Sequence, residues 1–306
     1  MSVNAHGRRR FLEFARDNGT LPDIVSWHSW SANGEAIPGE VSTMRRYLER
    51  EQMPYEGLAI NEMIYWDEFG QPGSTVANYM NVESIGSGRG CEGGMACPMG
   101  NFVGAIDTNW FPRYVVGGAL SVSIPDGGRV VEHGLQPVKF HRRAVWHAHA
   151  GYGNLTGQML NLSSAPVDVA ALATVTHDGA SVHVLVAHSG RRADNSTALA
   201  LTLVLQHCDE GAPGAVANGS TDPTGSEERV AWLAHITPDV TNCSSRQSQH
   251  QPPDPQCAIT NSSLSSPSYS RVAVAVVGGA VSVELPVLRA QEVLSIRVAP
   301  GCAGVR

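Results

Sequence analysis

The sequence predicts an α/β region over residues 1–156 and an all-β region over residues 157–306. In the first region, helix-like and strand-like segments alternate, which implies parallel strands joined by crossover helices. In the second region, short Val-rich runs follow one another between turns, and several alternate apolar and polar residues. That rhythm is typical of a β-sandwich.

Four segments of the first region carry apolar residues at helical spacing. In the second of them, for example, Val41, Met44 and Leu48 recur on one face. Asn18-Gly19 ends the first helix. We expect helices over residues 8–17, 39–52, 75–85 and 137–150.

Three strands should separate these helices, and each runs into a polar, aromatic tip. They cover residues 23–30, 58–66 and 102–110, and their tips carry Trp30, Trp66 and Trp110. In a (β/α)8 barrel the active face lies at the carboxyl ends of the strands. The α/β region is therefore predicted to be the C-terminal part of a (β/α)8 TIM-type barrel.

The all-β region should contain seven strands, separated by turns such as His177-Asp178-Gly179. Residues 207–228 and 239–268 are rich in Ser, Asn, Pro and Gly and are expected to be long surface loops. The predicted strands cover residues 167–176, 181–187, 198–205, 229–236, 271–277, 280–288 and 292–298.

The sequences at the strand tips resemble those of a known protein family. The segments 22–30 (PDIVSWHSW), 60–62 (INE) and 105–110 (AIDTNW) resemble strands six, seven and eight of clan A retaining glycoside hydrolases. The chain is similar to the family thirty-nine group of β-xylosidases and α-iduronidases, in which a β-sandwich follows the barrel. This resemblance implies that Glu62 is the nucleophile. It also implies that the acid/base, an Asn-Glu pair ending strand four, has no counterpart here.

The resemblance and the residue types together define a candidate site. Retaining hydrolysis uses a nucleophilic carboxylate and a carboxylic acid roughly 5–5.5 Å apart, and Glu62 is the nucleophile candidate; alternatively, it forms a salt bridge at a strand end. By family analogy His28 contacts substrate or orients Glu62, or else it is a structural histidine. At least one of Trp27 and Trp30 should belong to the core. The predicted substrate-binding residues are His28, Trp30, Asn61, Trp66 and Trp110. For Asn61 a role in a tight turn is an equal alternative.

Other chemistry is not indicated. His141, His147 and His149 do not share one helical face well, so no metal site is expected. Gly86-Ser87-Gly88-Arg89-Gly90 lacks a following helix and is better explained as a linker than as a phosphate loop. Asp67 and Glu68 are expected to be solvated loop acids; alternatively, they contact sugar hydroxyls. No cofactor is predicted.

Charge and sequence motifs bear on partners and location. The net charge of −7 argues against nucleic acid or an anionic membrane as a partner, and no stretch approaches the ~18 apolar residues of a membrane span. Six cysteines and a cluster of sequons favour a secreted, oxidised protein. We expect disulfides Cys91–Cys97 and Cys243–Cys257, because each pair would close a short loop. The connectivity itself does not follow from the sequence. The glycosylation candidates are Asn154, Asn161, Asn195, Asn218, Asn242 and Asn261.

Residues 1–7 have no apolar core and do not form a signal peptide. We therefore expect the beginning of the parent protein to be missing. The predicted function is retaining hydrolysis of an oligo- or polysaccharide, by a fragment that is inactive or weakly active alone. The alternative is a carbohydrate-binding or structural remnant without turnover. Sugar specificity and oligomeric state do not follow from the sequence.

Overall fold

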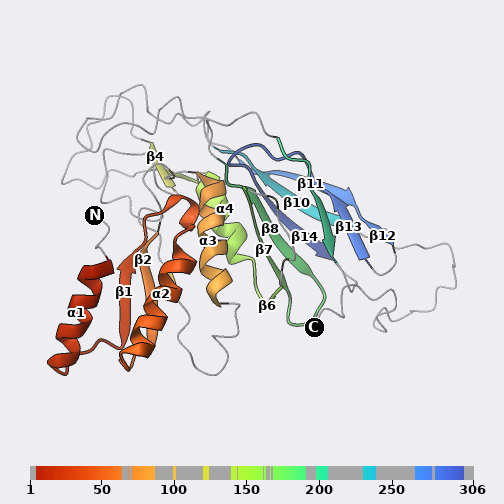
Figure 1. Cartoon of the computed structure of the whole chain (residues 1–306). Coiled ribbons are helices and arrows are strands. Elements are labelled where there is room, and N and C mark those ends of the chain that lie inside the picture. The colour runs from red at the N-terminus through yellow and green to blue at the C-terminus, as the bar shows by residue number, and fades with distance from the viewer. Residues whose placement is uncertain are drawn as a thin grey trace.

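The computed structural model describes residues 5–63, 68, 71–86, 99–100, 120–123, 139–142, 144–160, 162, 166, 168–190, 198–205, 230–238, 266–277 and 280–299. Helices α3 and α4 lie between an α/β part that contains the N-terminus and a β-sandwich (Figure 1). None of the helices in these ranges is long and apolar enough to cross a membrane.

The α/β part is built on a small parallel sheet with the order β1-β2-β3. Its strands are β1 (Ile24–His28), β2 (Gly57–Glu62) and β3 (Met99–Gly100), and its helices are α1 (Ala5–Asp17), the 3-10 turn η1 (Ala32–Gly34) and α2 (Ile37–Arg50). Helix α3 (Pro72–Gly86) follows β2 in the chain and lies between this part and the sandwich. Within the described ranges this sheet does not close into a barrel.

Strand β1 shows which face of the parallel sheet is covered. Val25 and Trp27 are buried, whereas Ile24, Ser26 and His28 are exposed. The buried face packs with α1 and α2 in a core that includes Leu12 and Leu48. Because successive side chains of a strand point to opposite faces, His28 lies on the face that this core does not cover.

The C-terminal part is a β-sandwich. A six-stranded antiparallel sheet has the order β11-β10-β14-β8-β7-β6, and a three-stranded sheet has the order β12-β13-β9. Leu205, Val281 and Val283 of the smaller sheet share one core with the larger sheet. The strands are β6 (Gln158–Met159), β7 (Val169–Val175), β8 (Val182–His188), β9 (Thr202–Leu205), β10 (Val230–Ile236), β11 (Ser268–Ala273), β12 (Ala275–Val277), β13 (Ala280–Glu284) and β14 (Val293–Ala299).

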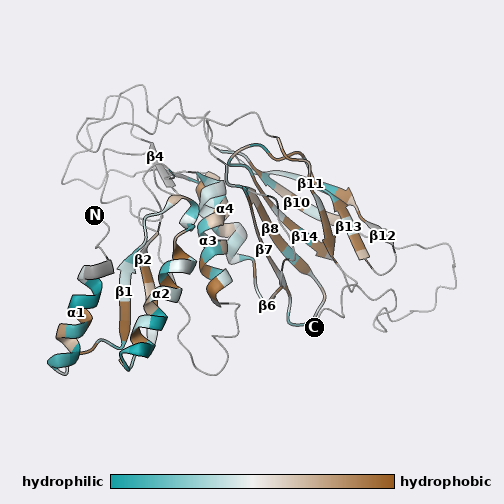
Figure 2. Cartoon of the chain, in the orientation of Figure 1, coloured by the Kyte–Doolittle hydropathy of each residue, from teal (hydrophilic) through white to brown (hydrophobic). Residues whose placement is uncertain are grey.

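The second face of the larger sheet is covered by α3 and by α4 (Ala144–Gly153). Small side chains allow this close approach: Ala77 and Ala148 pack with Ala187, and a β-carbon added at Gly151 would lie 2.9 Å from Leu185 Cδ1. Strands covered on both sides need apolar residues throughout. Every residue of β7 is accordingly buried, and β7 and β8 are among the most hydrophobic strands (Figure 2).

The predicted α/β and sandwich elements that lie in the described ranges are largely present, with two differences. The helix predicted over 137–150 is wrong at its start, because β5 (Lys139–Arg142) pairs with β4 (Leu120–Ser123) before α4 begins. The predicted strand 271–277 lies in two strands, β11 and β12, which belong to different sheets. The predicted strand 102–110 falls outside the described residues, and Met99–Gly100 pairs with β2.

Candidate active site

The carboxyl ends of β1 and β2 bring two predicted site residues together. The parallel register pairs Trp27 with Ile60 and then His28 with Glu62, so the pairing skips Asn61. Such an irregularity changes the direction of the side chains that follow it. The structure describes the backbone of Asn61 and Glu62, while their side chains lie outside the described part.

The two tryptophans of the first strand tip have different roles. Trp27 is buried, its Nε1 donates a hydrogen bond to Glu40 Oε2 at 2.8 Å, and the Arg8 guanidinium lies 5.4 Å from its ring. Trp30 instead stacks with His28, with ring centroids 6.1 Å apart and planes 17° apart. The expectation that at least one of the pair belongs to the core is therefore confirmed, and Trp27 is that residue.

Several predicted residues lie outside the described part of the chain. These include Trp66 and Trp110, all four disulfide candidates (Cys91, Cys97, Cys243 and Cys257) and five of the glycosylation candidates (Asn161, Asn195, Asn218, Asn242 and Asn261). The sixth, Asn154, is exposed just after α4. These assignments remain predictions.

Glu68 was predicted to be a solvated loop acid, and that prediction is wrong. Its side chain is buried, its Oε1 accepts a hydrogen bond from the Asn33 backbone N–H at 2.6 Å, and its Oε2 lies 3.5 Å from Asn78 Nδ2. A buried carboxylate needs such donors, because burial without partners is costly. Glu68 thus links the segments that follow β1 and β2. Nothing in the local sequence indicated this, since the donors lie 35 residues before it and 10 after it.

A second polar group, not anticipated from sequence, lies between α3 and α4. The Tyr79 hydroxyl and His149 Nδ1 share a hydrogen bond, and the Tyr152 hydroxyl donates one to Glu83. The two tyrosine rings stack with centroids 3.8 Å apart. Burial lowers the pKa of His149 to about 4 and raises the pKa of both tyrosines. Within the described ranges no group of His, Cys, Asp and Glu could hold a metal ion.

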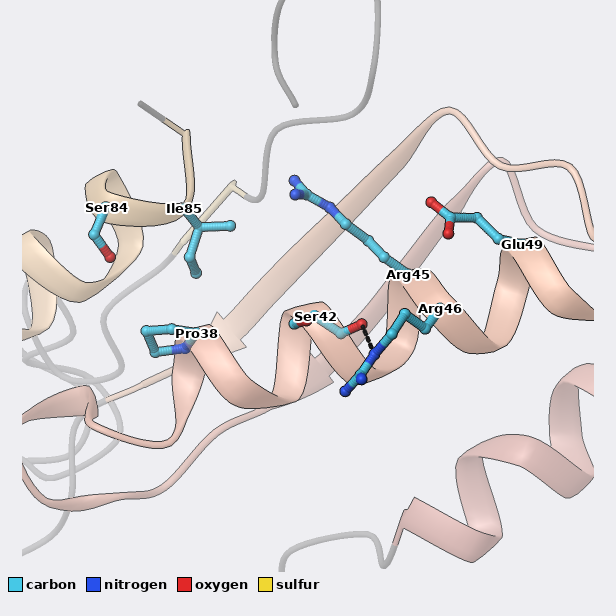
Figure 3. A pocket seen from close by; sticks show the side chains of 7 residues that line it. All are labelled: Pro38, Ser42, Arg45, Arg46, Glu49, Ser84 and Ile85. Atoms are coloured by element: carbon cyan, nitrogen blue, oxygen red, sulfur yellow. Dashed lines mark hydrogen bonds between the residues drawn. The ribbon is translucent and has the colours of Figure 1, made fainter. Parts of the chain in front are cut away.

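A shallow hollow of about 370 Å³ lies between α2 and α3 (Figure 3). It combines two arginines with one glutamate, and Arg46 Nε donates a hydrogen bond to the Ser42 carbonyl at 3.4 Å. None of the predicted site residues lines it, so it is distinct from the strand-end site. Its lining residues are Pro38, Ser42, Arg45, Arg46, Glu49, Ser84 and Ile85.

Several solved structures are similar to this chain in fold over nearly its whole length. N2152 from Neocallimastix frontalis is 15% identical over 98% of this chain, with a TM-score of 0.55. A bacterial orthologue of human α-L-iduronidase is 15% identical over 91%, with a TM-score of 0.58. The GH39 enzyme from Xanthomonas axonopodis pv. citri is 16% identical over 95%, with a TM-score of 0.50.

At these identities the likeness shows a common fold, and glycoside hydrolases are among the proteins that have it. The chain spans 59%, 49% and 57% of the length of these three structures, respectively. By sequence, no known protein family and no curated protein matches the chain.

Proposed function

We propose that this chain is the C-terminal portion of a retaining glycoside hydrolase in which Glu62 is the nucleophile. A Glu62 carboxylate oxygen bonds to the anomeric carbon while the bond from that carbon to the leaving oxygen breaks. A carboxylic acid supplied by the upstream half of a (β/α)8 barrel donates the proton to the leaving oxygen. Water then releases the sugar from Glu62 with retained configuration.

One observation carries the proposal: the backbone of Glu62 pairs with that of His28 at the carboxyl ends of adjacent parallel strands. This is the edge of an α/β sheet at which catalytic residues gather. The exposed His28 stacks with Trp30, and aromatic rings suit the apolar faces of sugars. The fold shared with an iduronidase orthologue and a GH39 enzyme supports the same reaction class.

The second candidate is carbohydrate binding without turnover. The short parallel sheet favours it, because three strands in the described ranges do not close a barrel. Glu68 accepts hydrogen bonds from the Asn33 N–H and from Asn78, so we assign it to holding the segments after β1 and β2 and not to donating the proton. We therefore expect residues 1–306 alone to hydrolyse glycosides weakly or not at all, while retaining affinity for the sugar.

The test compares two isosteric variants at opposite ends of β2. Glu62→Gln removes the proposed nucleophile, whereas Glu56→Gln makes the same change at an exposed position next to the start of the strand. Both are assayed on aryl xylosides and aryl iduronides, in the 306-residue chain and in any longer natural form. We expect Glu62→Gln to abolish turnover and Glu56→Gln to leave it unchanged. Normal turnover by Glu62→Gln would refute the assignment.

Binding separates the two candidates. Tryptophan fluorescence titrated with xylo-oligosaccharide reports occupancy near Trp30 whether or not the sugar is cleaved. Saturable binding without hydrolysis by any form of the protein would favour the second candidate. Neither binding nor hydrolysis would exclude both. We further propose that the protein passes through the secretory pathway, where the predicted glycosylation and disulfide bonds form.

A further inference from the structure

Gln291 lies where the β-sandwich meets the α/β part. It has a left-handed backbone, with φ of 68°, and its side chain is only 3% exposed. Its Nε2 lies within hydrogen-bonding distance of the Ser189 carbonyl (3.2 Å), the Gly190 carbonyl (3.0 Å) and Ser74 Oγ (3.1 Å). Its Oε1 accepts from the Ser74 backbone N–H at 2.8 Å. Both polar atoms of the Gln291 side chain, Nε2 and Oε1, therefore have hydrogen-bond partners.

The contact with Ser74 replaces a local helix cap. The first N–H groups of a helix lack partners within it, and a Ser, Thr, Asp or Asn before the first turn often accepts from one of them. Here Gln71 precedes α3, and the acceptor for the Ser74 N–H is Gln291, 217 residues away. Gly73 makes room for this contact, because an added β-carbon would lie 2.8 Å from Gln291 Oε1.

The same hydrogen-bond network continues to the segments after β1 and β2. The Ser189 carbonyl, which accepts from Gln291, also accepts from Asn33 Nδ2 at 3.2 Å. Asn33 in turn donates its backbone N–H to Glu68. Asn33 follows the His28–Trp30 tip, and Glu68 follows Glu62. The sandwich is therefore connected through Gln291 and Ser189 to both segments that adjoin the candidate site.

We propose that Gln291 is a positioning residue through which the sandwich fixes the segments after β1 and β2, and with them the sugar-contacting tip. The effect of Gln291 on sugar binding rests on the proposed function. The hydrogen-bonded linkage between the sandwich and these segments does not. It assigns the sandwich a part in substrate binding without any direct contact to the sugar.

The experiment measures hydrogen–deuterium exchange in Gln291→Met, which keeps the side-chain length and removes the side-chain hydrogen bonds, while the backbone N–H still donates to the His188 carbonyl. Gln52→Met is the matched control, since Gln52 is also left-handed, with φ of 53°, but exposed. We expect exchange over residues 31–36 and 72–78 to accelerate at least tenfold in Gln291→Met, with α1 and β10 unchanged. The control should resemble the wild type.

Two outcomes would overturn the proposal: unchanged exchange over residues 31–36, or an equal acceleration throughout the chain, which would indicate general destabilisation. If Gln291→Met does not fold, Ser74→Ala removes one partner of the same amide and should give the same local pattern more weakly; a global or absent effect contradicts the role equally.

A measurement of sugar affinity tests the functional consequence of the proposal. With xylo-oligosaccharide as the probe, Gln291→Met should bind at least tenfold more weakly than Gln52→Met at a temperature where both are folded. Equal affinities would contradict the positioning role. If the wild type binds no sugar, the proposed function fails, while the exchange pattern still decides whether Gln291 fixes these segments.

Discussion

Gly73 packs so closely on His188 that a β-carbon at position 73 would lie 2.4 Å from the His188 carbonyl oxygen. Gly73 belongs to the first turn of α3, and His188 ends β8. The approach of the helix to the sheet therefore depends on the absence of a side chain here. The same point is where Gln291 reaches Ser74.

We expect Gly73→Ala to lower the free energy of unfolding by about 1–3 kcal/mol, because backbone on both sides must shift to relieve the contact. Urea denaturation measures the change. The matched control is Gly39→Ala in α2, where an added β-carbon meets nothing within 4 Å. That variant should be neutral or more stable by up to about 1 kcal/mol. Equal changes in the free energy of unfolding for the two variants would show that the close approach of Gly73 to His188 does not determine stability.

His149 should make stability depend on pH. Burial lowers its pKa to about 4 in the folded chain, whereas the unfolded chain takes up the proton near pH 6.5. Between these values the unfolded state binds more protons, so the free energy of unfolding falls as pH falls. The loss attributable to His149 is roughly 3 kcal/mol at most, and it is absent above pH 6.5.

The measurement is urea denaturation at several pH values between 4 and 7. His149→Asn keeps a polar group near the Tyr79 hydroxyl but does not titrate, so it should flatten the profile. His177→Asn alters an exposed histidine and should keep the wild-type slope. A profile unchanged by His149→Asn would contradict the buried, neutral histidine.

Glu68 should behave as a structural acceptor. Glu68→Ala leaves the partly buried Asn33 N–H without its 2.6 Å partner. A fully buried donor without a partner costs about 1–3 kcal/mol, so we expect a loss at the lower end of that range. Glu35→Ala, an exposed acid near the same turn, should change stability little. Thermal and urea unfolding of both variants provide the comparison, and similar stabilities would indicate that Glu68 holds nothing in place.

Asn154 should carry a glycan when the chain is made in a eukaryotic secretory pathway. It is exposed in the sequon Asn154-Leu155-Thr156, just after α4. Asn18 has the same motif, but its Nδ2 donates to the Phe14 carbonyl at 2.8 Å and so caps α1. Asn154→Gln should remove one glycan by mass spectrometry, while Asn18→Gln should remove none. The reverse result would contradict this reading.

Local periodicity accounts for what was predictable in the fold. Val41, Met44 and Leu48 repeat at helical spacing and are buried in α2. The β7 and β8 strands form dense apolar runs because the smaller sheet covers one face and α3 and α4 cover the other. The strand at Lys139–Arg142 was missed because it is defined by pairing with β4, a partner about twenty residues away.

The candidate site was predictable only in part, for a related reason. His28 and Glu62 could be assigned to strand ends from short motifs, and the register brings their backbones together. The contacts that anchor the adjoining segments could not be assigned, because Gln291 and Ser74 meet across 217 residues. A turn glutamine has no local pattern that distinguishes it from any other polar turn residue.

Covalent trapping tests the central claim most directly. A 2-deoxy-2-fluoroglycosyl fluoride has a leaving group that departs with little acid assistance, so it reports the nucleophile even where the acid is absent. We expect xylo- or ido-configured reagents to add one fluorosugar to the wild type, on the peptide containing Glu62, and none to Glu62→Gln. A fluorosugar attached to any other carboxylate, or equal labelling of Glu62→Gln, would contradict the account.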